Sequence, residues 1–333
     1  MIICRTPYRI SFFGGGTDYP GWYRENGGAV LSTTIDKYCY ITVRHLPPFF
    51  DYKYRIRYYK REEVNTLEDI KHPSIRECLR YMEVTRGADL VHHGDLPAQS
   101  GLGTSSTFTV CLLHALHALH YRMPTKRQLA LEAIDIEQNR IGENVGSQDQ
   151  TAAAFGGLNL IEFSAGQEIL VTPMIVAPER LREMRGNMLL FFTGMQRQAS
   201  EIAAEQIRTL NDRATELREM TQVVYEAKNI LASTGPIEEF GKLLHQQWLL
   251  KRSLSKLISN DAIDDIYQRA RKAGATGGKL LGAGGGGFML FFVRPELQEA
   301  VKEALGDLLH VPFRFDVTGS QIIYHAPQSE DER

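Results

Sequence analysis

The stretch Pro97–Ser106, PAQSGLGTSS, has the composition of a phosphate-binding loop that runs straight into a helix. Its glycines, Gly101 and Gly103, free the backbone to approach an anion without interference from side chains. The next three residues carry hydroxyl groups and stand where an apolar helical run begins: Thr104, Ser105 and Ser106. Because the first amides of a helix lack intrahelical partners, phosphate binds there readily. An ordinary cap on a core helix would give the same local sequence, so the loop alone leaves both interpretations open.

A second glycine run, Gly282–Gly287, reads GAGGGG and formally contains the GxGxxG dinucleotide fingerprint. That fingerprint requires a strand before it and a helix after it. Here a predicted helix, Asp261–Ala273, precedes the run, and Phe288–Val293 follows as an apolar, strand-like segment. This order argues against an NAD-linked oxidoreductase, and the chain has no GxxxxGK[ST] string of the Walker type. The glycines instead indicate a backbone that lies close to a ligand or to another chain segment.

A third segment, Arg5–Pro20, reads RTPYRISFFGGGTDYP. With Pro97–Ser106 and Gly278–Leu290 it follows the order and spacing of the three motifs of the GHMP kinase superfamily (galacto-, homoserine, mevalonate and phosphomevalonate kinases), which the chain resembles. The strings GGGTDYP, GSQDQ, FFTG and GGKLLGAGGGGF are most similar to a sugar 1-kinase branch of that superfamily. The branch contains D-glycero-D-manno-heptose 7-phosphate kinases and the kinase part of fucokinases. Gly15 and Gly16 stand where galactokinase-like proteins usually carry Glu-His, which argues against galactose as the acceptor.

The alternation of strands and helices predicts an α+β fold. In the first 180 residues we expect strands at Ile2–Arg5, Arg9–Phe13, Cys39–Val43, Arg55–Tyr59, Ala88–His92 and Gly157–Glu162, and helices at Ser74–Tyr81, Ser105–His120, Lys126–Arg140 and Gln148–Ala154. At Pro173–Arg185 the pattern of strands and helices becomes less regular, which indicates a domain junction. Beyond it we expect strands at Met188–Phe192, Phe288–Val293 and near Phe313–Tyr324. We also expect three to five helices within Ala199–Ala273 and a helix at Pro295–Leu305. The resemblance implies a ribosomal-protein-like, ATP-binding N-terminal domain (residues 1–180) and a ferredoxin-like C-terminal domain (residues 185–333).

Composition narrows the class of partner. The apolar share of 43% and the charged share of 23% are those of a soluble globular protein. A net charge of −2 gives no electrostatic reason to expect nucleic acid or an anionic membrane as a partner. The four cysteines lack CxxC spacing, which favours buried free thiols and a cytoplasmic location. A homodimer is compatible with these features.

One carboxylate is conspicuous on the predicted helix Lys126–Arg140. Glu137 shares a face with four apolar residues: Ala130, Ala133, Ile134 and Ile141. A carboxylate on an apolar stripe is costly unless it is paired or binds metal, although a glutamate near a helix end can also reach solvent. The resemblance implies that Glu137 and Ser106 bind Mg²⁺, because the metal-binding glutamate of these kinases stands twelve residues before the catalytic aspartate.

That spacing makes Asp149, in GSQDQ, the aspartate that orients the acceptor hydroxyl, and Arg9 the cation that pairs with it. Read without the resemblance, Asp149 is an acid at a helix start and Arg9 an outward-facing strand residue. The resemblance also implies that the loop from Gly101 through Leu102, Gly103, Thr104 and Ser105 to Ser106 holds the phosphates of ATP.

For the acceptor, the resemblance implies binding by Asp18, with Thr17, Gly15, Gly16 and Gly285 around it. A turn-forming role for Asp18 is the local alternative. A phosphorylated acceptor would also need a cation, for which Arg197, shortly after FFTG, is the first choice and Lys37 the second.

Two further patterns are read as structural. The histidines of HALHALH are His114, His117 and His120, and their spacing of three does not keep them on one face of the helix. No Cys or Asp completes a metal site with them, so we interpret them as a packed or half-exposed face. The run Asp51–Arg61, DYKYRIRYYKR, alternates with period two, as expected of a half-exposed strand.

Taken together, the resemblance implies an ATP- and Mg²⁺-dependent kinase that phosphorylates the anomeric hydroxyl of D-glycero-D-manno-heptose 7-phosphate. A fucokinase-like sugar 1-kinase and a non-catalytic sugar- and ATP-binding regulator on the same fold are the alternatives. The joint presence of Asp149, Glu137, Ser106 and Arg9 argues against the regulator, because a sensor needs no metal or acceptor-orienting groups.

Overall fold

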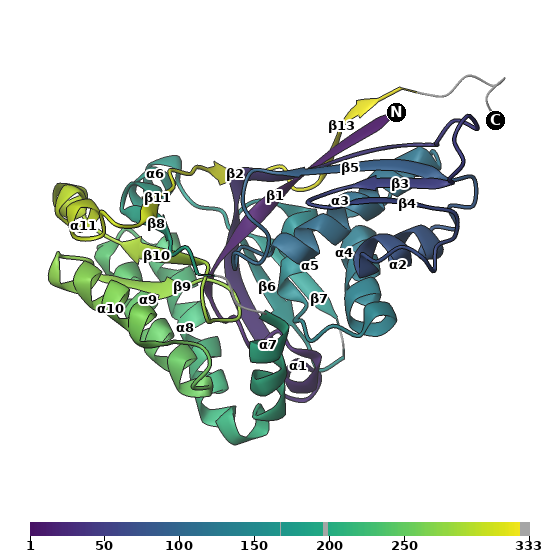
Figure 1. Cartoon of the computed structure of the whole chain (residues 1–333). Coiled ribbons are helices and arrows are strands. Elements are labelled where there is room, and N and C mark those ends of the chain that lie inside the picture. Colours follow the sequence, from purple (N-terminus) through teal and green to yellow (C-terminus); the bar gives the residue numbers. More distant parts are fainter. Residues whose placement is uncertain (167, 196–198, 327–333) are drawn as a thin grey trace.

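The fold is built from two sheets and the helices packed against them, as the computed structural model shows (Figure 1). The structure describes residues 1–166, 168–195 and 199–326. In these residues the larger sheet has nine strands and the smaller sheet four. The two sheets carry helices of both halves of the chain, so the predicted α+β class is confirmed.

The larger sheet is organised around one long strand, β2 (Gly28–Arg44). Its path is β13-β1-β2-β5-β3-β4, with β12 and β6 also paired to β2 and β7 paired to β6. The remaining strands are β1 (Ile2–Phe13), β3 (Tyr54–Arg57), β4 (Arg61–Val64), β5 (Ala88–Gly94), β6 (Asn159–Phe163), β7 (Ile169–Pro173), β12 (Phe315–Asp316) and β13 (Gln321–His325). All these pairs are antiparallel except β3 with β5.

Helices of the first half lie against this sheet (Figure 1). They are α1 (Pro20–Asn26), α2 (Pro73–Tyr81), α3 (Thr104–Leu119), α4 (Lys126–Asp135), the π-helical turn η1 (Ile136–Ile141) and α5 (Gln148–Phe155). Almost the whole of α3 is buried, because its sequence is apolar on nearly every side. It packs on β1 and β2, so its N-terminus is fixed next to the middle of β1.

The smaller sheet has the order β11-β8-β10-β9 and belongs to the second half. Its strands are β8 (Met188–Phe192), β9 (Gly277–Leu280), β10 (Phe288–Phe292) and β11 (Leu309–His310). The helices are α6 (Pro178–Gly186), α7 (Ala199–Arg208), α8 (Ala214–Ala232), α9 (Glu238–Leu254), α10 (Asp261–Lys272) and α11 (Gln298–Ala304), with short 3₁₀ turns at Asn211–Arg213 and Pro295–Leu297.

The two halves share one continuous apolar core. Phe240 on α9 packs edge-on against Phe12 and Phe13 of β1, with ring centroids 5.5 and 4.9 Å apart. Each such aromatic pair adds about 0.5–1.5 kcal/mol to simple burial. This core fixes α9 alongside β1, which decides what α9 can contribute to the site.

Several sequence-based expectations need correction. The two expected strands Ile2–Arg5 and Arg9–Phe13 form one strand, β1, with a register shift between Pro7 and Arg9. The expected helix Lys126–Arg140 is α-helical only to Asp135 and continues as η1. A strand, β9, separates the helix α10 from the glycine run, so GAGGGG is the loop of a β-hairpin. The dinucleotide fold is still excluded, because a strand rather than a helix follows the run.

Two more expectations fail at the junction and at the C-terminal end. The stretch read as a loose junction forms the end of β7 and the helix α6. The single strand expected near Phe313–Tyr324 is two strands, β12 and β13, and both pair with the first-half sheet. The chain therefore returns to its starting sheet, and β13 lies beside the start of β1, near the marked N-terminus, in Figure 1.

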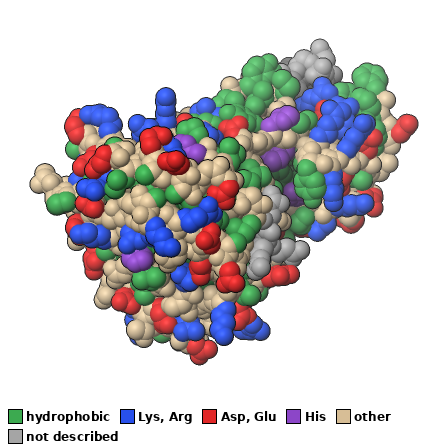
Figure 2. All heavy atoms as spheres, turned by 60° about the vertical axis from the view of Figure 1, so that its left-hand side comes forward, with side chains coloured by type: hydrophobic (Ala, Val, Ile, Leu, Met, Phe, Trp, Pro, Cys, Tyr) green, Lys and Arg blue, Asp and Glu red, His purple; other side chains and the backbone are tan. Residues whose placement is uncertain are grey.

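Acidic and basic side chains are interspersed on the face of the molecule shown in Figure 2. Within residues 1–166, 168–195 and 199–326, no helix has the length and apolar character needed to cross a bilayer. Cys4, Cys39, Cys78 and Cys111 are all buried free thiols, as the sequence predicts.

Candidate active site

A cavity of about 460 Å³ lies where the two halves meet. Its wall combines the middle of β1 and the turn after it, the loop before α3, the segment leading into α5, α7, α9 and the β9–β10 hairpin. Ten of the residues that the sequence predicts for the site line this cavity: Arg9, Gly15, Gly16, Asp18, Gly101, Gly103, Thr104, Ser105, Ser106 and Asp149.

The two glycine-rich loops touch each other through their backbones. A Cβ on Gly101 would lie 2.4 Å from the carbonyl oxygen of Leu281, and one on Gly282 would lie 2.6 Å from the Cα of Gly101. Gly287 approaches the carbonyl of Ser100 in the same way. Of the two explanations the sequence left open for GAGGGG, close approach of another chain segment is therefore the one observed.

The N-terminus of α3 presents unused donors to the cavity. Gly103 precedes α3 with φ +73°, a conformation that favours glycine. Among the described residues, no side chain caps the helix and its first turn has no acidic residue. Leu102 differs from the rest of its loop, because its side chain is fully buried and its carbonyl accepts the N–H of Arg9. The first-turn amides thus remain available to an anion.

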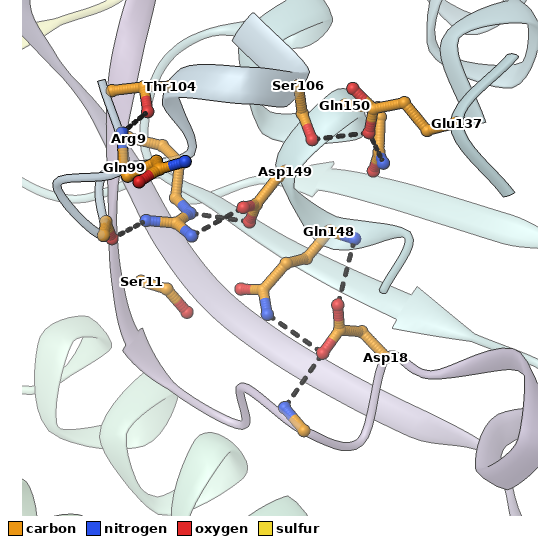
Figure 3. Close-up of polar contacts among 12 residues, drawn as sticks. Arg9, Ser11, Asp18, Gln99, Thr104, Ser106, Glu137, Gln148, Asp149 and Gln150 are labelled. Carbon is orange, nitrogen blue, oxygen red and sulfur yellow. Dashed lines mark hydrogen bonds and ion pairs between the residues drawn. The ribbon is translucent and has the colours of Figure 1, made fainter. Parts of the chain in front are cut away.

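Arg9 and Asp149 form a two-pronged ion pair in the middle of the cavity (Figure 3). Arg9 Nε and Nη2 donate to the two carboxylate oxygens of Asp149, each at 2.7 Å, and Arg9 Nη1 donates to the Gly101 carbonyl at 2.7 Å. Arg9 is 3% exposed, while the Asp149 side chain is 24% exposed. The guanidinium therefore fixes a carboxylate that still faces the open space, beside the loop Gly101–Ser106.

Asp18 is a buried carboxylate at the other end of the cavity (Figure 3). It accepts hydrogen bonds from the Gly16 N–H (2.9 Å), the Gln148 N–H (3.2 Å) and Gln148 Nε2 (2.9 Å). Burial raises the pKa of Asp18, and the nearby Asp149 adds to the rise. Gly146 is the residue that leaves room for this carboxylate, because a Cβ there would lie 1.9 Å from Asp18 Oδ2.

Four other residues predicted to bind the acceptor do not line the cavity or lie outside the described residues. Thr17 Oγ1 donates to the carbonyls of Gly14 and Ala29, so it fastens the turn rather than facing the cavity. Gly285 is buried in the hairpin loop, where its N–H donates to the Ile258 carbonyl. Arg197 lies outside the described residues. Lys37 contacts Asp36 instead of the cavity.

Glu137 is fully buried behind the start of α3. Its Oε2 accepts hydrogen bonds from Ser106 Oγ (2.7 Å) and Gln150 Nε2 (2.5 Å), whereas Oε1 has no partner among the described residues. Burial raises the pKa of Glu137 to about 7. The π-helical turn η1 places this carboxylate, and such irregular turns often occur at functional sites. An oxygen-only pair with one unused carboxylate oxygen suits a hard cation with few protein ligands.

Comparisons with known proteins agree with this geometry. The chain matches the family models for the GHMP kinases N terminal domain over residues 71–157 and the GHMP kinases C terminal domain over residues 227–310. A D-glycero-alpha-D-manno-heptose 7-phosphate kinase of Campylobacter jejuni is 31% identical over 318 residues, covering 91% of this chain and 93% of that protein. The chain belongs to the GHMP kinase family. It is an ATP-dependent sugar kinase of this family, and the predicted two-domain GHMP kinase fold is confirmed.

Solved structures of GHMP kinases extend the likeness over the whole chain. One is a D-glycero-D-manno-heptose 1-phosphate kinase of Bacteroides thetaiotaomicron, with a TM-score of 0.79, 26% identity, and coverage of 98% of this chain and 100% of that one. Another is a putative sugar kinase of Campylobacter jejuni, with a TM-score of 0.72, 28% identity and coverage of 97% and 98%. A Lactococcus lactis galactokinase, at 18% identity and a TM-score of 0.72, shares the fold.

The sequence analysis missed two cations in the cavity of this GHMP kinase, Lys251 on α9 and Lys279 on β9. Both are buried, with 5% and 4% exposure. A signal for Lys251 was present: it continues the apolar stripe Leu244, Trp248 and Leu254, the same pattern that singled out Glu137. Ser11 was also missed, although it follows Arg9 by two residues and so shares its face of β1.

A second hollow, about 630 Å³ and open to solvent, lies at the C-terminal end of α3, away from the glycine loops. It contains two of the three histidines of HALHALH, and His117 Nε2 is 2.6 Å from Glu132 Oε2. The third, His114, contacts Ser320. The part of the chain that the structure describes holds no group of three or more His, Cys, Asp or Glu side chains placed for a metal ion.

Proposed function

We propose that this GHMP kinase transfers the γ-phosphoryl group of ATP to the anomeric hydroxyl of D-glycero-D-manno-heptose 7-phosphate, forming the 1,7-bisphosphate. Two relatives support a heptose phosphate as the acceptor, through the names of the Campylobacter jejuni enzyme and the Bacteroides thetaiotaomicron structure. The observation that carries the proposal is the Arg9–Asp149 pair, which lies between a helix N-terminus suited to phosphate and a second buried carboxylate suited to a sugar.

The phosphates of ATP would bind at the loop Gly101–Ser106 and at the first turn of α3. The uncapped amides there supply donors and the partial positive charge of the helix. Thr104 is held by the backbone of the same loop, since its Oγ1 accepts the N–H of Gln99 at 3.1 Å. The shape of this loop is therefore set before the nucleotide arrives.

Asp149 would orient the acceptor hydroxyl and receive its proton as the O–P bond forms. Phosphoryl transfer is largely dissociative, so alignment matters more than full deprotonation beforehand. Arg9 holds Asp149 in place and faces the transferring group, where its charge opposes the charge that builds on the equatorial oxygens. Asp18, with the backbone of Gly15 and Gly16, would accept the sugar hydroxyls on the far side.

Mg²⁺ would be held by Glu137 and Ser106, which together offer a carboxylate oxygen without a partner and a hydroxyl that faces the cavity. When bound, the ion would neutralise charge on the β- and γ-phosphates. Ser106 would then turn from its present bond to Glu137, and Gln150 would keep the carboxylate in position. We place the reaction in the cytoplasm, because all four cysteines are free thiols.

The test is to measure ATP consumption by the purified enzyme with hexoses, heptoses and their phosphates, and to locate the new phosphate by ³¹P NMR. The proposal expects heptose 7-phosphate to be the best acceptor, with the product phosphorylated at carbon 1. Preferred turnover of fucose or another unphosphorylated sugar would replace it with a general sugar 1-kinase. Binding of ATP and sugar without any transfer would point to a regulator.

A further inference from the structure

The acceptor end of the cavity contains two buried ammonium groups, and neither contacts a carboxylate of residues 1–166, 168–195 or 199–326. Lys251 Nζ donates to Gln206 Oε1 at 2.7 Å and to the Gly15 carbonyl at 3.2 Å. Lys279 Nζ donates to the carbonyls of Ser11 and Phe12, at 2.8 and 3.1 Å. All these partners are neutral. An ammonium has three donors, so each lysine keeps one N–H free of any described partner.

The electrostatic surroundings leave positive charge uncompensated. Arg9, the third cation of the cavity, is neutralised by its contact with Asp149. Asp18 and Asp149 favour the charged form of Lys251 from a distance, but burial and Arg9 outweigh them and lower its pKa to about 8. Burial and the repulsion of Lys251 and Arg9 also lower the pKa of Lys279. Two charges in such a position are costly until an anion arrives.

The polar atoms next to Lys251 and Lys279 indicate that these lysines belong to a binding site and do not only link parts of the fold. Ser11 Oγ is buried, faces the cavity and has no partner among the described residues. A Cβ placed on Gly15 would lie 3.6 Å from Ser11 Oγ and 3.3 Å from Gln148 Nε2, so these groups surround one point. If the lysines served only to hold α9 and β9 against β1, neutral donors would do so at lower cost.

We propose that Lys251 and Lys279, with the Ser11 hydroxyl, form the receptor for a phosphate monoester on the acceptor sugar, and that they select phosphorylated over unphosphorylated acceptors. A phosphate monoester carries close to two negative charges near neutral pH and offers three acceptor oxygens, which matches two ammonium groups and one hydroxyl. This assignment takes the place of Arg197, the residue favoured from the sequence.

The inference rests on the proposed function, because it names the residues of the same site that bind the acceptor's phosphate. The receptor lies beside Gly15 and Gly16, the turn that also supplies an amide to Asp18. A sugar could therefore meet Asp149 with its anomeric hydroxyl, Asp18 with further hydroxyls, and the lysines with its distal phosphate.

The first test compares Lys251→Met with the wild type on three substrates: heptose 7-phosphate, heptose without phosphate, and ATP. We expect KM for heptose 7-phosphate to rise about tenfold or more, from the loss of one charged contact, and the other two KM values to change less than threefold. Lys242→Met is the matched control, because Lys242 lies on the same helix but is exposed. It should leave all three values unchanged. An equal rise for both sugars, or a rise for ATP, overturns the assignment.

A second test uses the unmodified enzyme and so does not depend on the folding of a variant. Inorganic phosphate should inhibit competitively against the acceptor, whichever sugar that proves to be, and not against ATP. Competition with ATP alone would place the anion site at the nucleotide and refute the receptor. If heptose 7-phosphate is not turned over but phosphate still competes with another acceptor, the heptose assignment fails while the anion receptor stands.

Discussion

The two ends of the cavity are built in different ways. At the end proposed to bind ATP (the nucleotide end), the donors come from one continuous stretch, Gly101–Ser106, which includes the first residues of α3. At the acceptor end, side chains from β1, the α5 start, α9 and β9 meet, although they are far apart in the sequence. A local motif can therefore reveal the whole of the first end, whereas the folded chain is needed to show which residues of the second end meet.

The ion pair between the two ends should give the largest effect. Asp149→Asn keeps the size of the side chain but removes the charge that orients the acceptor hydroxyl. We expect turnover to fall on the order of 10²-fold or more, with ATP affinity and thermal stability little changed. Steady-state kinetics together with a nucleotide-binding titration measures both. Turnover within a few-fold of the wild type would mean that Asp149 only anchors Arg9.

The proposed Mg²⁺ site lies at the nucleotide end, so its loss should leave the acceptor end intact. Glu137→Gln should raise the Mg²⁺ concentration needed for half-maximal activity by about tenfold or more, because one of few protein ligands becomes neutral. KM for the acceptor, measured at saturating Mg²⁺, should stay the same. If Glu137 were only a buried core residue, the Mg²⁺ titration of the variant would superimpose on that of the wild type.

A pair of glycine substitutions separates the two ends. Gly146→Ala places a Cβ against the Asp18 carboxylate, and should raise KM for the acceptor by about tenfold, the effect of roughly 1.4 kcal/mol, with KM for ATP unchanged.

Gly101→Ala forces a side chain onto a backbone with a positive φ of +81° and brings it against the Leu281 carbonyl. This substitution should raise KM for ATP and lower the stability of the fold, by about 1–3 kcal/mol. Parallel kinetics and thermal melts test both. If each variant changed KM for the acceptor and KM for ATP equally, the two ends of the cavity would not be functionally separate.

The smallest effect concerns pH. Lys251, with a pKa of about 8, is charged below that pH and loses its proton above it. Asp18, Asp149 and the cations Arg9 and Lys279 surround it, and an acceptor phosphate remains doubly charged over this range. KM for the phosphorylated acceptor should therefore rise about fourfold between pH 7 and pH 8.5 as Lys251 deprotonates. Lys251→Met should abolish most of that rise, and a profile shared by both proteins would assign the titration elsewhere.

Much of the nucleotide end could be predicted because its information is local. The apolar run of α3 and the glycines before it predict a loop that leads into a helix, and one stripe on the expected helix Lys126–Arg140 singled out Glu137. The same stripe rule, applied to α9, would have singled out Lys251. The π-helical turn at Ile136–Ile141 could not be anticipated, because the stripe through Glu137 and Ile141 follows ordinary α-helical spacing.

The rest depended on contacts between distant segments. The first half of β2 reads GAVLSTTI, without strict alternation of apolar and polar residues, and it forms a strand paired with β1 and β6. The need for glycine at Gly146 arises from Asp18, which lies in a turn more than a hundred residues earlier. Burial of Lys279 likewise depends on the carbonyls of β1. Patterns within one segment carry no trace of such partners.

The most direct test of the account is the ratio of kcat/KM for heptose 7-phosphate to that for heptose without the phosphate, measured on the wild-type enzyme at saturating ATP and Mg²⁺. Two ammonium groups at the acceptor end predict a ratio of about 100 or more, as expected if each lysine contributes roughly 1.4 kcal/mol. A ratio near one would contradict both the phosphate receptor and the heptose-phosphate assignment. The protein would then be a GHMP sugar kinase that does not distinguish acceptors by their distal phosphate.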